Sequence, residues 1–511
     1  MEADLIITKK DEAFVKIKCE KYIAKEMSEY FTFLVPGYQF SPAFKNKFWD
    51  GKIRLFHLDS FTIYTGLLPH IEDFCESNGY TIEYRDDLDI EDEFSLYHAK
   101  KFAESLNIHS NNKKIEVNDH QYSVFIHSMQ HKRALFVSPT ASGKSLIAYM
   151  LFRQLHDYKR LKGLMIVPTT SLVEQMTTDF EDYSSHNNFN VKENVNKIYD
   201  YKGMVKQTDK SLTISTWQSL FKEPKEFFEQ FDYVIGDEAH TFKSQSLITI
   251  MTACTNAKYR IGMTGTLDGT KTHKLVLEGL FGKAKQFVTT KDLMDKGIVS
   301  KLEIKCLILK HPENKCKELK EYAKNEETKD SSYKNEIDYI INCEERNKFI
   351  KNLAVSMKTN TLVLYDLVEK HGKILYDLIK NTEKLGDRKV FFIHGKIKTE
   401  EREIIRKQVE LEKDAIIIAS YKTFSTGNNI KNLHNIIFAS PSKARIKNLQ
   451  SIGRSLRLFE GKLIATLYDI SDDIRYNKYM NHTLKHFVDR VKIYTEEKFP
   501  FKIYKIGLKN G

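Results

Sequence analysis

Cysteine is scarce in this 511-residue chain, and its spacing excludes two kinds of structural site. The six cysteines are Cys19, Cys75, Cys254, Cys306, Cys316 and Cys343. They include no CxxC pair, which a zinc site or a thiol–disulfide motif would need. Scattered single cysteines are typical of reduced thiols in a reducing compartment. We therefore expect neither a zinc site nor a disulfide.

Long apolar runs are also missing. No stretch approaches the roughly 18 apolar residues that a membrane-spanning helix needs. The first fourteen residues alternate charged and apolar side chains and lack a signal-peptide core. The sequence therefore predicts a cytoplasmic protein with no membrane partner.

Negative charge is deficient in one half of the chain. Residues 301–511 contain 42 Lys+Arg against 29 Asp+Glu, a net of +13, whereas the remainder carries −2 of the total +11. A basic half suits a polyphosphate partner, because neutralising phosphates releases condensed counterions. Hydrophobic residues make up 41% and charged residues 29%, as in an ordinary globular protein.

Four segments follow one another along the chain. Residues 1–90 mix strand-like stretches with a helical run at 68–78 and end in an acidic stretch, 86–93, that resembles a linker. Residues 91–300 and 346–511 each alternate short β-branched runs with longer amphipathic ones, the pattern of a doubly wound parallel sheet. Residues 301–345 connect those two segments, and the stretch from about 310 to 348 has a charged, helical pattern. After Asp472 a further helix-like run extends to about Lys498. We expect an α/β protein with a small α/β N-terminal domain and two tandem doubly wound parallel-sheet lobes.

Ten buried strands are expected in the two lobes. In the first they span 134–138, 163–167, 212–215, 233–236 and 259–263, and in the second 361–365, 390–393, 415–420, 435–439 and 463–468.

A phosphate loop follows the first of these strands and leads into an apolar helix. Backbone N–H groups at a helix N-terminus bind phosphates, Lys144 would reach the β- and γ-phosphates of ATP, and Ser145 would ligate Mg²⁺. The motif GxxxxGK[ST] expects glycine where Ser138 stands. The predicted nucleotide-binding residues of the loop are Ser138, Pro139, Thr140, Ala141, Ser142, Gly143, Lys144 and Ser145.

A pair of carboxylates follows the strand at 233–236. A carboxylate at the C-terminal end of a neighbouring strand can hold Mg²⁺, here Asp237, and the adjacent Glu238 can deprotonate the attacking water. An exposed acidic turn would have the same composition. The position directly after a buried strand, about ninety residues beyond the phosphate loop, favours an ATP site.

With these residues the sequence resembles the DEAH-type helicases of superfamily two. The wording at Asp237–His240 is DEAH, and segments 167–172, 215–218, 264–266, 420–427 and 450–457 resemble five further motifs in the family's order. The resemblance implies two RecA-like lobes, adenine recognition by Gln121, a nucleotide contact at Gly427, and coupling of the ATP and nucleic-acid sites through His240. It also implies backbone contacts to nucleic acid from Thr169, Thr170, Trp217 and Thr423.

Two arginines in the second lobe fit the same chemistry. Arg454 and Arg457 are three residues apart in a helical pattern and so share a face. Guanidinium groups stabilise charge on a transferred phosphoryl group once they are brought up to it. We expect both to complete the ATP site when the lobes close.

The N-terminal segment interleaves aromatic and basic side chains around residues 38–54. Aromatic rings can stack on bases while lysine and arginine contact phosphate, although a small domain also needs aromatics for its own core. The basic residues expected to contact DNA are Lys45, Lys47, Lys52 and Arg54.

Across nearly its whole length the sequence is similar to a family of recombination helicases from tailed phages. The resemblance implies a monomeric motor that uses ATP and Mg²⁺ to remodel branched DNA, including Holliday junctions, stalled forks and R-loops that contain RNA. Three alternatives remain: an RNA helicase, a duplex DNA translocase that does not separate strands, and a non-catalytic scaffold, which the intact ATP-site residues disfavour.

Overall fold

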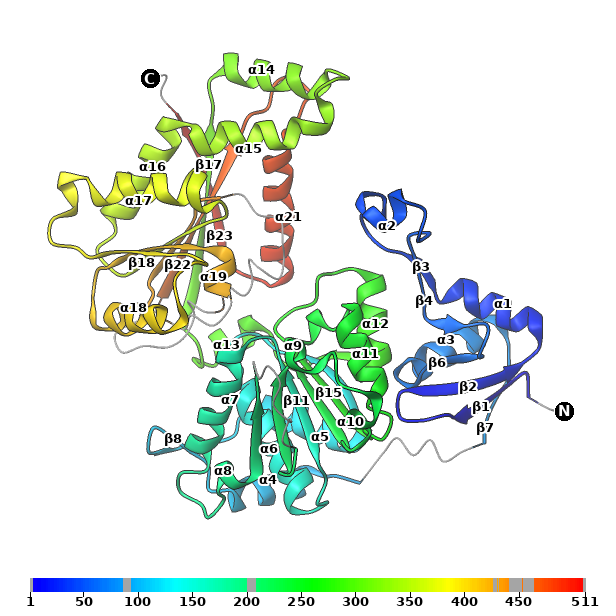
Figure 1. The fold of residues 1–511 in the computed structure, drawn as a ribbon. Helices are drawn as coiled ribbons and strands as arrows, with labels where there is room; N and C mark the ends of the chain where they lie inside the picture. The colour runs from blue at the N-terminus through cyan, green and yellow to red at the C-terminus, as the bar shows by residue number, and fades with distance from the viewer. Residues whose placement is uncertain are drawn as a thin grey trace. The chain divides into compact units, whose positions relative to one another are not determined.

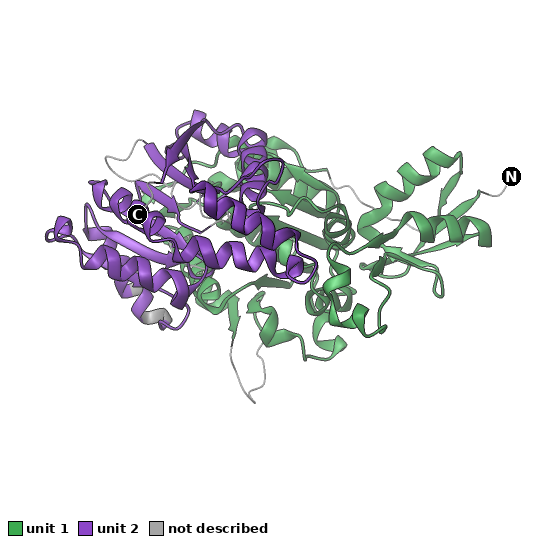
Figure 2. Cartoon of the chain, turned by 90° about the horizontal axis from the view of Figure 1, so that it is seen from above, with its two compact units in different colours: residues 1–138, 142–288 green, residues 139–141, 289–511 purple. Residues whose placement is uncertain are grey.

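The computed structural model of the chain divides into two compact units. Residues 1–138 and 142–288 form the first, and residues 139–141 and 289–511 form the second (Figure 2). The structure describes residues 3–85, 93–199, 208–425, 430, 432–440, 453 and 464–508. Within those ranges, no helix combines the length and apolar character that crossing a membrane requires.

The N-terminal part of the first unit is a five-stranded sheet in the order β5-β6-β2-β1-β7 (Figure 1). Its elements are β1 (Leu5–Lys9), β2 (Phe14–Cys19), α1 (Lys21–Tyr30), β5 (Phe56–His57), β6 (Thr62–Tyr64), η2 (Thr65–Leu67), α3 (Leu68–Asn78) and β7 (Ile82–Tyr84). Alternating burial in β2 matches a sheet with one face against a core, and α1 buries Ile23, Ala24 and Met27. The helix α3 has the limits that the sequence pattern predicts.

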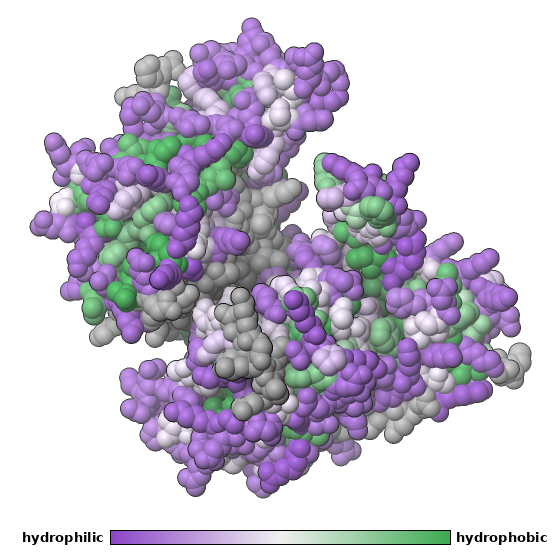
Figure 3. Space-filling model, in the orientation of Figure 1, coloured by the Kyte–Doolittle hydropathy of each residue, from purple (hydrophilic) through white to green (hydrophobic). Residues whose placement is uncertain are grey.

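A separate two-stranded ribbon extends from this domain. Strands β3 (Thr32–Leu34) and β4 (Lys52–Arg54) pair antiparallel, and the residues between them form η1 (Tyr38–Phe40) and α2 (Pro42–Lys45). Figure 3 shows hydrophobic side chains gathered on this arm, in agreement with the high exposure of Phe40 and Phe48. We call residues 32–54 the ribbon arm.

The rest of the first unit is a seven-stranded parallel sheet in the order β12-β13-β11-β14-β15-β10-β16. Its strands are β10 (Arg133–Val137), β11 (Gly163–Val167), β12 (Val195–Ile198), β13 (Leu212–Thr216), β14 (Tyr233–Asp237), β15 (Tyr259–Thr264) and β16 (Ala284–Gln286). Its helices are α4 (Leu96–Ser105), α5 (Asp119–His131), α6 (Lys144–Asp157), α7 (Thr170–Tyr183), α8 (Val191–Asn194), α9 (Trp217–Leu220), α10 (Lys225–Glu229), η3 (Ala239–Thr241), α11 (Gln245–Ala253) and α12 (Lys271–Phe281), and a short hairpin pairs β8 (His109–Ser110) with β9 (Lys113–Lys114).

Helices cover both faces of this sheet, as its continuously apolar strands require. One face packs Phe136 and Met165 against α4, α5, α6 and α7. The other packs Leu135 and Leu164 against α11 and α12, and that second core continues into the N-terminal domain through residues such as Leu67. The N-terminal domain and the first lobe therefore share one hydrophobic core.

The second unit contains another seven-stranded parallel sheet, in the order β19-β20-β18-β21-β22-β17-β23. Its strands are β17 (Lys301–Lys310), β18 (Thr361–Tyr365), β19 (Val390–Ile393), β20 (Ile416–Ser420), β21 (Asn435–Phe438), β22 (Ile464–Asp473) and β23 (Phe501–Gly507). Its helices are α13 (Thr290–Asp295), α14 (Glu313–Lys324), η4 (Lys329–Ser331), α15 (Ser332–Asn342), α16 (Glu344–Ser356), η5 (Val368–Gly372), α17 (Lys373–Lys380), η6 (Glu383–Leu385), α18 (Thr399–Leu411), α19 (Tyr421–Ser425) and α21 (His482–Glu496). The expected fold class is confirmed, because both lobes are parallel α/β sheets with helices between the strands.

Buried charges fasten helices to β22 in this unit. Asp472 accepts from Arg346 Nε at 2.8 Å and lies 2.9 Å from His311 Nε2, and all three side chains are fully buried. Asp469 accepts from Arg490 Nη2 at 2.8 Å, which ties α21 to the sheet. Both of these buried carboxylates are therefore paired with a buried arginine.

The structure corrects two features of the expected second lobe. Residues 301–310, assigned to the connector, form the inner strand β17, whereas the helical pattern expected after them is confirmed by α14 and α15. The helix expected from Asp472 to about Lys498 is shorter: β22 extends to Asp473, the helix spans His482–Glu496, and an edge strand, β23, follows. Four strands in the two sheets, β12, β16, β17 and β23, were not expected, and most of the acidic stretch 86–93 lies outside the described residues.

Candidate active site

The predicted motifs of the first lobe lie together at one edge of its sheet. The phosphate loop follows β10, Thr264 ends β15 and Asp237 ends β14, and these three strands are adjacent. Segments 167–172 and 215–218 follow β11 and β13, the next two strands along. Because carboxyl ends of parallel strands meet at one edge, the predicted ATP-site residues group on one side of that edge and the predicted nucleic-acid residues on the other.

The phosphate loop is held by its own backbone. Ser138 N–H donates to the Thr264 carbonyl at 2.8 Å, and the Ser138 carbonyl accepts from Lys144 Nζ at 3.0 Å. The Ser138 side chain is fully buried, and its hydroxyl finds no hydrogen-bond partner among the described residues. Helix α6 begins at Lys144, so the N–H groups of its first turn lie at the end of the loop, as a phosphate site requires.

Gly143 packs against Gln121 in a backbone conformation that favours glycine. Gly143 has φ +82°, and a Cβ there would collide with Gln121 Nε2. Gln121 is buried, its Nε2 donates to the Ser142 carbonyl at 3.1 Å, and its Oε1 accepts from Asn118 N–H at 2.9 Å. The expected adenine-reading glutamine therefore braces the phosphate loop from α5, and its contact with adenine remains a prediction.

Asp237 is a buried carboxylate beside a lysine. Burial raises the pKa of the Asp237 carboxyl well above its ordinary 3.8, the neighbouring Glu238 carboxylate raises it further, and Lys144 opposes the rise. A buried carboxylate at this position is strongly biased towards a compensating cation. Ser145 Oγ lies 2.9 Å from the Tyr183 hydroxyl, at the start of α6. The side-chain oxygens of Asp237 and Ser145 are of the type that a hard cation such as Mg²⁺ prefers.

Glu238 has an uncommon backbone conformation. It adopts the left-handed region, with φ 49°, in which a non-glycine residue is strained. Its Oε2 lies 3.4 Å from His240 Nδ1, which is also 3.0 Å from Thr264 Oγ1. Burial lowers the pKa of His240, whereas Glu238 raises it. His240 thus joins the predicted catalytic base to the end of β15.

The predicted nucleic-acid contacts lie at helix starts, with differing exposure. Thr169 caps α7 by accepting from Leu172 N–H at 3.4 Å, and Thr170 beside it is exposed. Trp217 is half-buried and packs on Phe221. Thr423 in the second unit is buried, and its hydroxyl lies 2.7 Å from Ser420 Oγ. Thr170 is thus the most accessible of the four.

The basic residues of the ribbon arm are exposed. Lys45, Lys47 and Lys52 all reach solvent, whereas Arg54 donates to Asp50 at 2.5 Å. That pair would have to open before Arg54 contacted a phosphate. Trp49, partly buried, donates from Nε1 to the Lys52 carbonyl at 2.8 Å and so supports the turn.

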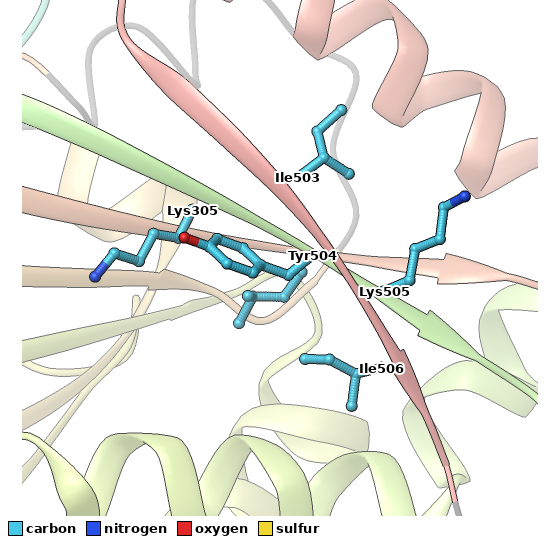
Figure 4. Close-up of a pocket in the computed structure, with 6 residues that line it drawn as sticks. Lys305, Ile503, Tyr504, Lys505 and Ile506 are labelled. Carbon is cyan, nitrogen blue, oxygen red and sulfur yellow. The ribbon is translucent and has the colours of Figure 1, made fainter.

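Some predicted residues lie outside the described part of the chain, namely Gly427, Arg454 and Arg457. A hollow of about 630 Å³ beside β23 is lined by Lys305, Leu307, Ile503, Tyr504, Lys505 and Ile506 (Figure 4), and it contains none of the predicted site residues.

Sequence reasoning missed two supporting residues. His120 Nε2 lies 2.9 Å from the Ser142 carbonyl, so it braces the phosphate loop together with Gln121. Tyr183 holds the hydroxyl of the predicted metal ligand Ser145. His120 could have been found as the neighbour of Gln121, but nothing in the sequence relates Tyr183 to a residue 38 positions earlier.

Comparison with protein families matches most of the chain. Residues 4–85 match the N-terminal domain of the DNA helicase UvsW, residues 94–269 the res subunit of type III restriction enzymes, and residues 344–459 the conserved C-terminal domain of helicases.

Individual relatives give the same picture. The ATP-dependent DNA helicase uvsW of Enterobacteria phage T4 is 34% identical over 514 residues, covering 98% of each chain. The crystal structure of T4 UvsW aligns with a TM-score of 0.51 at 31% identity, covering 99% of this chain and 100% of that one. The type ISP restriction-modification enzyme LlaBIII bound to DNA aligns with a TM-score of 0.56 at 15% identity, covering 77% of this chain and 32% of that one, a likeness of fold alone.

Proposed function

This chain belongs to the UvsW family of superfamily-two helicases, and we propose that it is an ATP-dependent DNA helicase that remodels branched DNA. The observation that carries the proposal is the grouping at the sheet edge of the first lobe. Three adjacent strands lead into the phosphate loop, Thr264 and the pair Asp237–Glu238. The next two strands lead into the segments at Thr169 and Trp217. One edge of the sheet would thus hold both the residues that hydrolyse ATP and the residues that contact nucleic acid.

We propose that ATP binds with Mg²⁺ at this edge. Asp237 and Ser145 would hold the ion, which would neutralise charge on the β- and γ-phosphates. The buried Asp237 carboxylate, with its raised pKa, fits a cation there. The backbone of residues 138–143 and Lys144 would bind the phosphates, and Gln121 the adenine.

Glu238 is the proposed general base for the attacking water. Its strained backbone and its neighbour His240 fix the carboxylate in place. His240 also contacts Thr264, which offers a route from the hydrolysis site to the loop after β15. In the second lobe Arg454 and Arg457 would stabilise charge on the transferred phosphoryl group, and Gly427 would contact the nucleotide.

The grip on DNA is proposed to be sequence-independent. Thr169, Thr170, Trp217 and Thr423 would contact the sugar–phosphate backbone, which positions a strand without reading bases. The ribbon arm would add Lys45, Lys47, Lys52 and, after release from Asp50, Arg54. Exposed lysines on a projecting arm suit the extra duplex of a branch point.

The proposed domain limits are 1–90 for the DNA-binding domain, 91–300 and 346–511 for the two lobes, and 301–345 for the connector, less the strand β17. We further propose that the protein acts as a monomer, in the cytoplasm of an infected cell, on branched or duplex DNA and on RNA within R-loops. Support for this setting comes from the phage origin of its relative.

Strand displacement tests the proposal. The purified chain would be given ATP and Mg²⁺ with a labelled four-way DNA junction, a forked duplex, an R-loop and an RNA duplex, beside a Glu238→Gln variant. We expect ATP-dependent resolution of the junction and fork, lost in the variant. Activity on RNA duplex alone would identify an RNA helicase. ATP hydrolysis without strand separation would identify a duplex translocase.

A further inference from the structure

One carboxylate beside the ATP site joins three segments of the first unit. Asp268 Oδ2 accepts from Lys243 Nζ at 2.5 Å and lies 2.5 Å from His273 Nδ1. Its Oδ1 accepts from the Thr270 N–H at 2.9 Å. Lys243 Nζ and His273 Nδ1 are themselves 3.1 Å apart. Asp268 therefore joins its own loop, which includes Thr270, to Lys243 and to His273.

Each of those parts has a distinct place in the unit. Lys243 follows His240 by three residues, just after the turn η3. Asp268 follows Thr266 by two residues, in the loop after β15 whose Thr264 contacts His240. His273 lies in the first turn of α12. The carboxylate thus connects the segment after η3 and the loop after β15 to the start of α12.

The C-terminal end of α12 packs against the N-terminal domain. Glu278 is almost fully buried, and its Oε2 lies 2.9 Å from His70 Nε2 of α3. Gly66 packs against the backbone of α12, where a Cβ would collide with the Glu278 and Gly279 carbonyls. Gly279 in turn packs against Tyr64, at 2.8 Å from a hypothetical Cβ to the ring. Figure 1 shows α12 beside β6 of that domain.

The charge state of the carboxylate suits a permanent tether. Partial burial raises the pKa of Asp268, but the hydrogen bonds from Lys243, Thr270 and His273 outweigh it and lower the pKa to about 2. The side chain is about one-quarter exposed, so the ion pair is screened only in part. The carboxylate stays ionised throughout the physiological pH range.

We propose that Asp268 is a positioning residue that couples the ATP-site loops to the N-terminal domain through α12. This inference rests on the proposed helicase function. It adds a path by which movement at the ATP site reaches the N-terminal domain. A shift of His240 or Thr264 during the ATP cycle displaces Lys243 and Asp268, and α12 transmits the displacement to α3, β6 and the ribbon arm. Neither Asp268 nor its partners Lys243, Thr270 and His273 are among the residues proposed to bind or hydrolyse ATP.

The chain provides a matched control for the loss of this carboxylate. Asp157, at the end of α6, also accepts from a cation and a histidine: from Arg153 Nη2 at 2.9 Å and beside His156 Nδ1 at 2.7 Å. Its exposure, 26%, is close to the 24% of Asp268. Asp157→Asn therefore removes a similar ion-pair cluster that does not link the ATP-site loops to α12.

The experiment compares wild type, Asp268→Asn, Asp268→Glu and Asp157→Asn. We would measure the DNA-stimulated ATPase rate, the DNA concentration at half-maximal stimulation, and the number of four-way junctions resolved per ATP hydrolysed. For Asp268→Asn we expect an ATPase rate and half-saturating DNA concentration within twofold of wild type. The junctions resolved per ATP should fall at least fivefold, recover in part in Asp268→Glu and stay unchanged in Asp157→Asn.

A second measurement does not depend on DNA or turnover. Hydrogen exchange would be measured with and without a non-hydrolysable ATP analogue. In wild type the analogue should change exchange in α12 and α3. In Asp268→Asn it should change exchange only in the loops after β10, β14 and β15. If Asp268→Asn folds poorly, Lys243→Met removes one of the same contacts. Unchanged coupling in these variants, or an equal loss in Asp157→Asn, would overturn the inference. Wild type that resolves no junction would instead overturn the proposed function.

Discussion

At the scale of single residues, the ATP site combines hydrogen bonds, burial and backbone strain that a motif alone does not specify. Gly143 has φ +82°, a conformation that favours glycine, and Glu238 has a left-handed conformation that a non-glycine residue adopts only under constraint. Ser138 has neither requirement. Its two backbone groups are bonded to Thr264 and Lys144.

Replacing Ser138 with glycine should therefore not improve the site. The loop conformation at this position is set by backbone hydrogen bonds that glycine would keep, and the cradle for phosphate is built from Gly143 and the start of α6. We expect the ATP dissociation constant of Ser138→Gly, measured by titration with a fluorescent ATP analogue, to stay within tenfold of wild type. An improvement of tenfold or more would show that serine weakens the site.

The buried histidine of the second unit should make that unit sensitive to alkaline pH. Burial lowers the pKa of His311, but hydrogen bonds to Asp472 and Cys343 raise it to about 9, above the ordinary 6.5. The folded pKa exceeds the unfolded one, so the stabilisation, roughly 3 kcal/mol, is complete below pH 6.5 and is lost as pH rises through 9. The pKa of Asp472 is lowered to about 2, so the contribution of that group is lost only in strong acid.

Hydrogen exchange in β17 and β22, compared between wild type and His311→Gln at the same pH, measures this effect. The protection advantage of wild type should be large at pH 6.5 and shrink towards pH 9.5. An advantage that stays constant or grows with pH would show that His311 does not carry the proton in the folded protein.

At the scale of elements, close packing of the N-terminal domain on α12 is the least expected feature. Gly66 and Gly279 allow the two backbones to approach, and His70 reaches the buried Glu278. The domain is therefore part of the first unit and not a tethered module.

Gly66→Ala should loosen this packing. The added methyl group would collide with two carbonyls, of which that of Gly279 would lie 2.6 Å away, and such overpacking costs about 1–3 kcal/mol. We expect faster hydrogen exchange in β6 and α12, with little change in β18 of the second unit. Gly395→Ala, where the structure offers open space around a Cβ, is the control. Equal exchange in β6 and α12 of wild type and Gly66→Ala would contradict a tight interface.

How much could be predicted from sequence differed from element to element for physical reasons. Strands β11, β18 and β19 are short apolar runs bounded by turns, so local pattern predicts their limits. Strand β17 carries charged residues beside charged helices, and edge strand β23 is largely exposed, so neither resembles a buried strand. In the site, the motif residues are adjacent in sequence. The Asp268 cluster joins residues that only the fold brings together.

At the scale of the whole molecule, the residues proposed to contact DNA and the residues proposed to bind ATP differ in charge and in exposure. The ribbon arm presents Lys45 and Lys47 to solvent, whereas the ATP-site carboxylate Asp237 is buried. Removing positive charge from the ribbon arm should therefore weaken the affinity for DNA and leave the rate of ATP hydrolysis without DNA unchanged.

The double variant Lys45→Ala/Lys47→Ala tests this separation. Each lysine that contacts a phosphate releases about one counterion, so the slope of log affinity for junction DNA against log salt should fall by about two. ATPase activity without DNA should stay unchanged. Lys100→Ala/Lys101→Ala, an exposed pair on α4 of the same unit, is the control. An unchanged slope in the arm variant, or an equal fall in the control, would exclude the arm from the DNA contact.

If the protein remodels branched DNA, a DNA junction should stimulate its ATP hydrolysis. Steady-state ATPase activity would be measured alone and with single-stranded DNA, linear duplex, a four-way junction and RNA, with Glu238→Gln as the inactive control. We expect strong stimulation by the junction in wild type and none in Glu238→Gln. Stimulation by RNA alone, or activity no higher than that of Glu238→Gln under every condition, would contradict it.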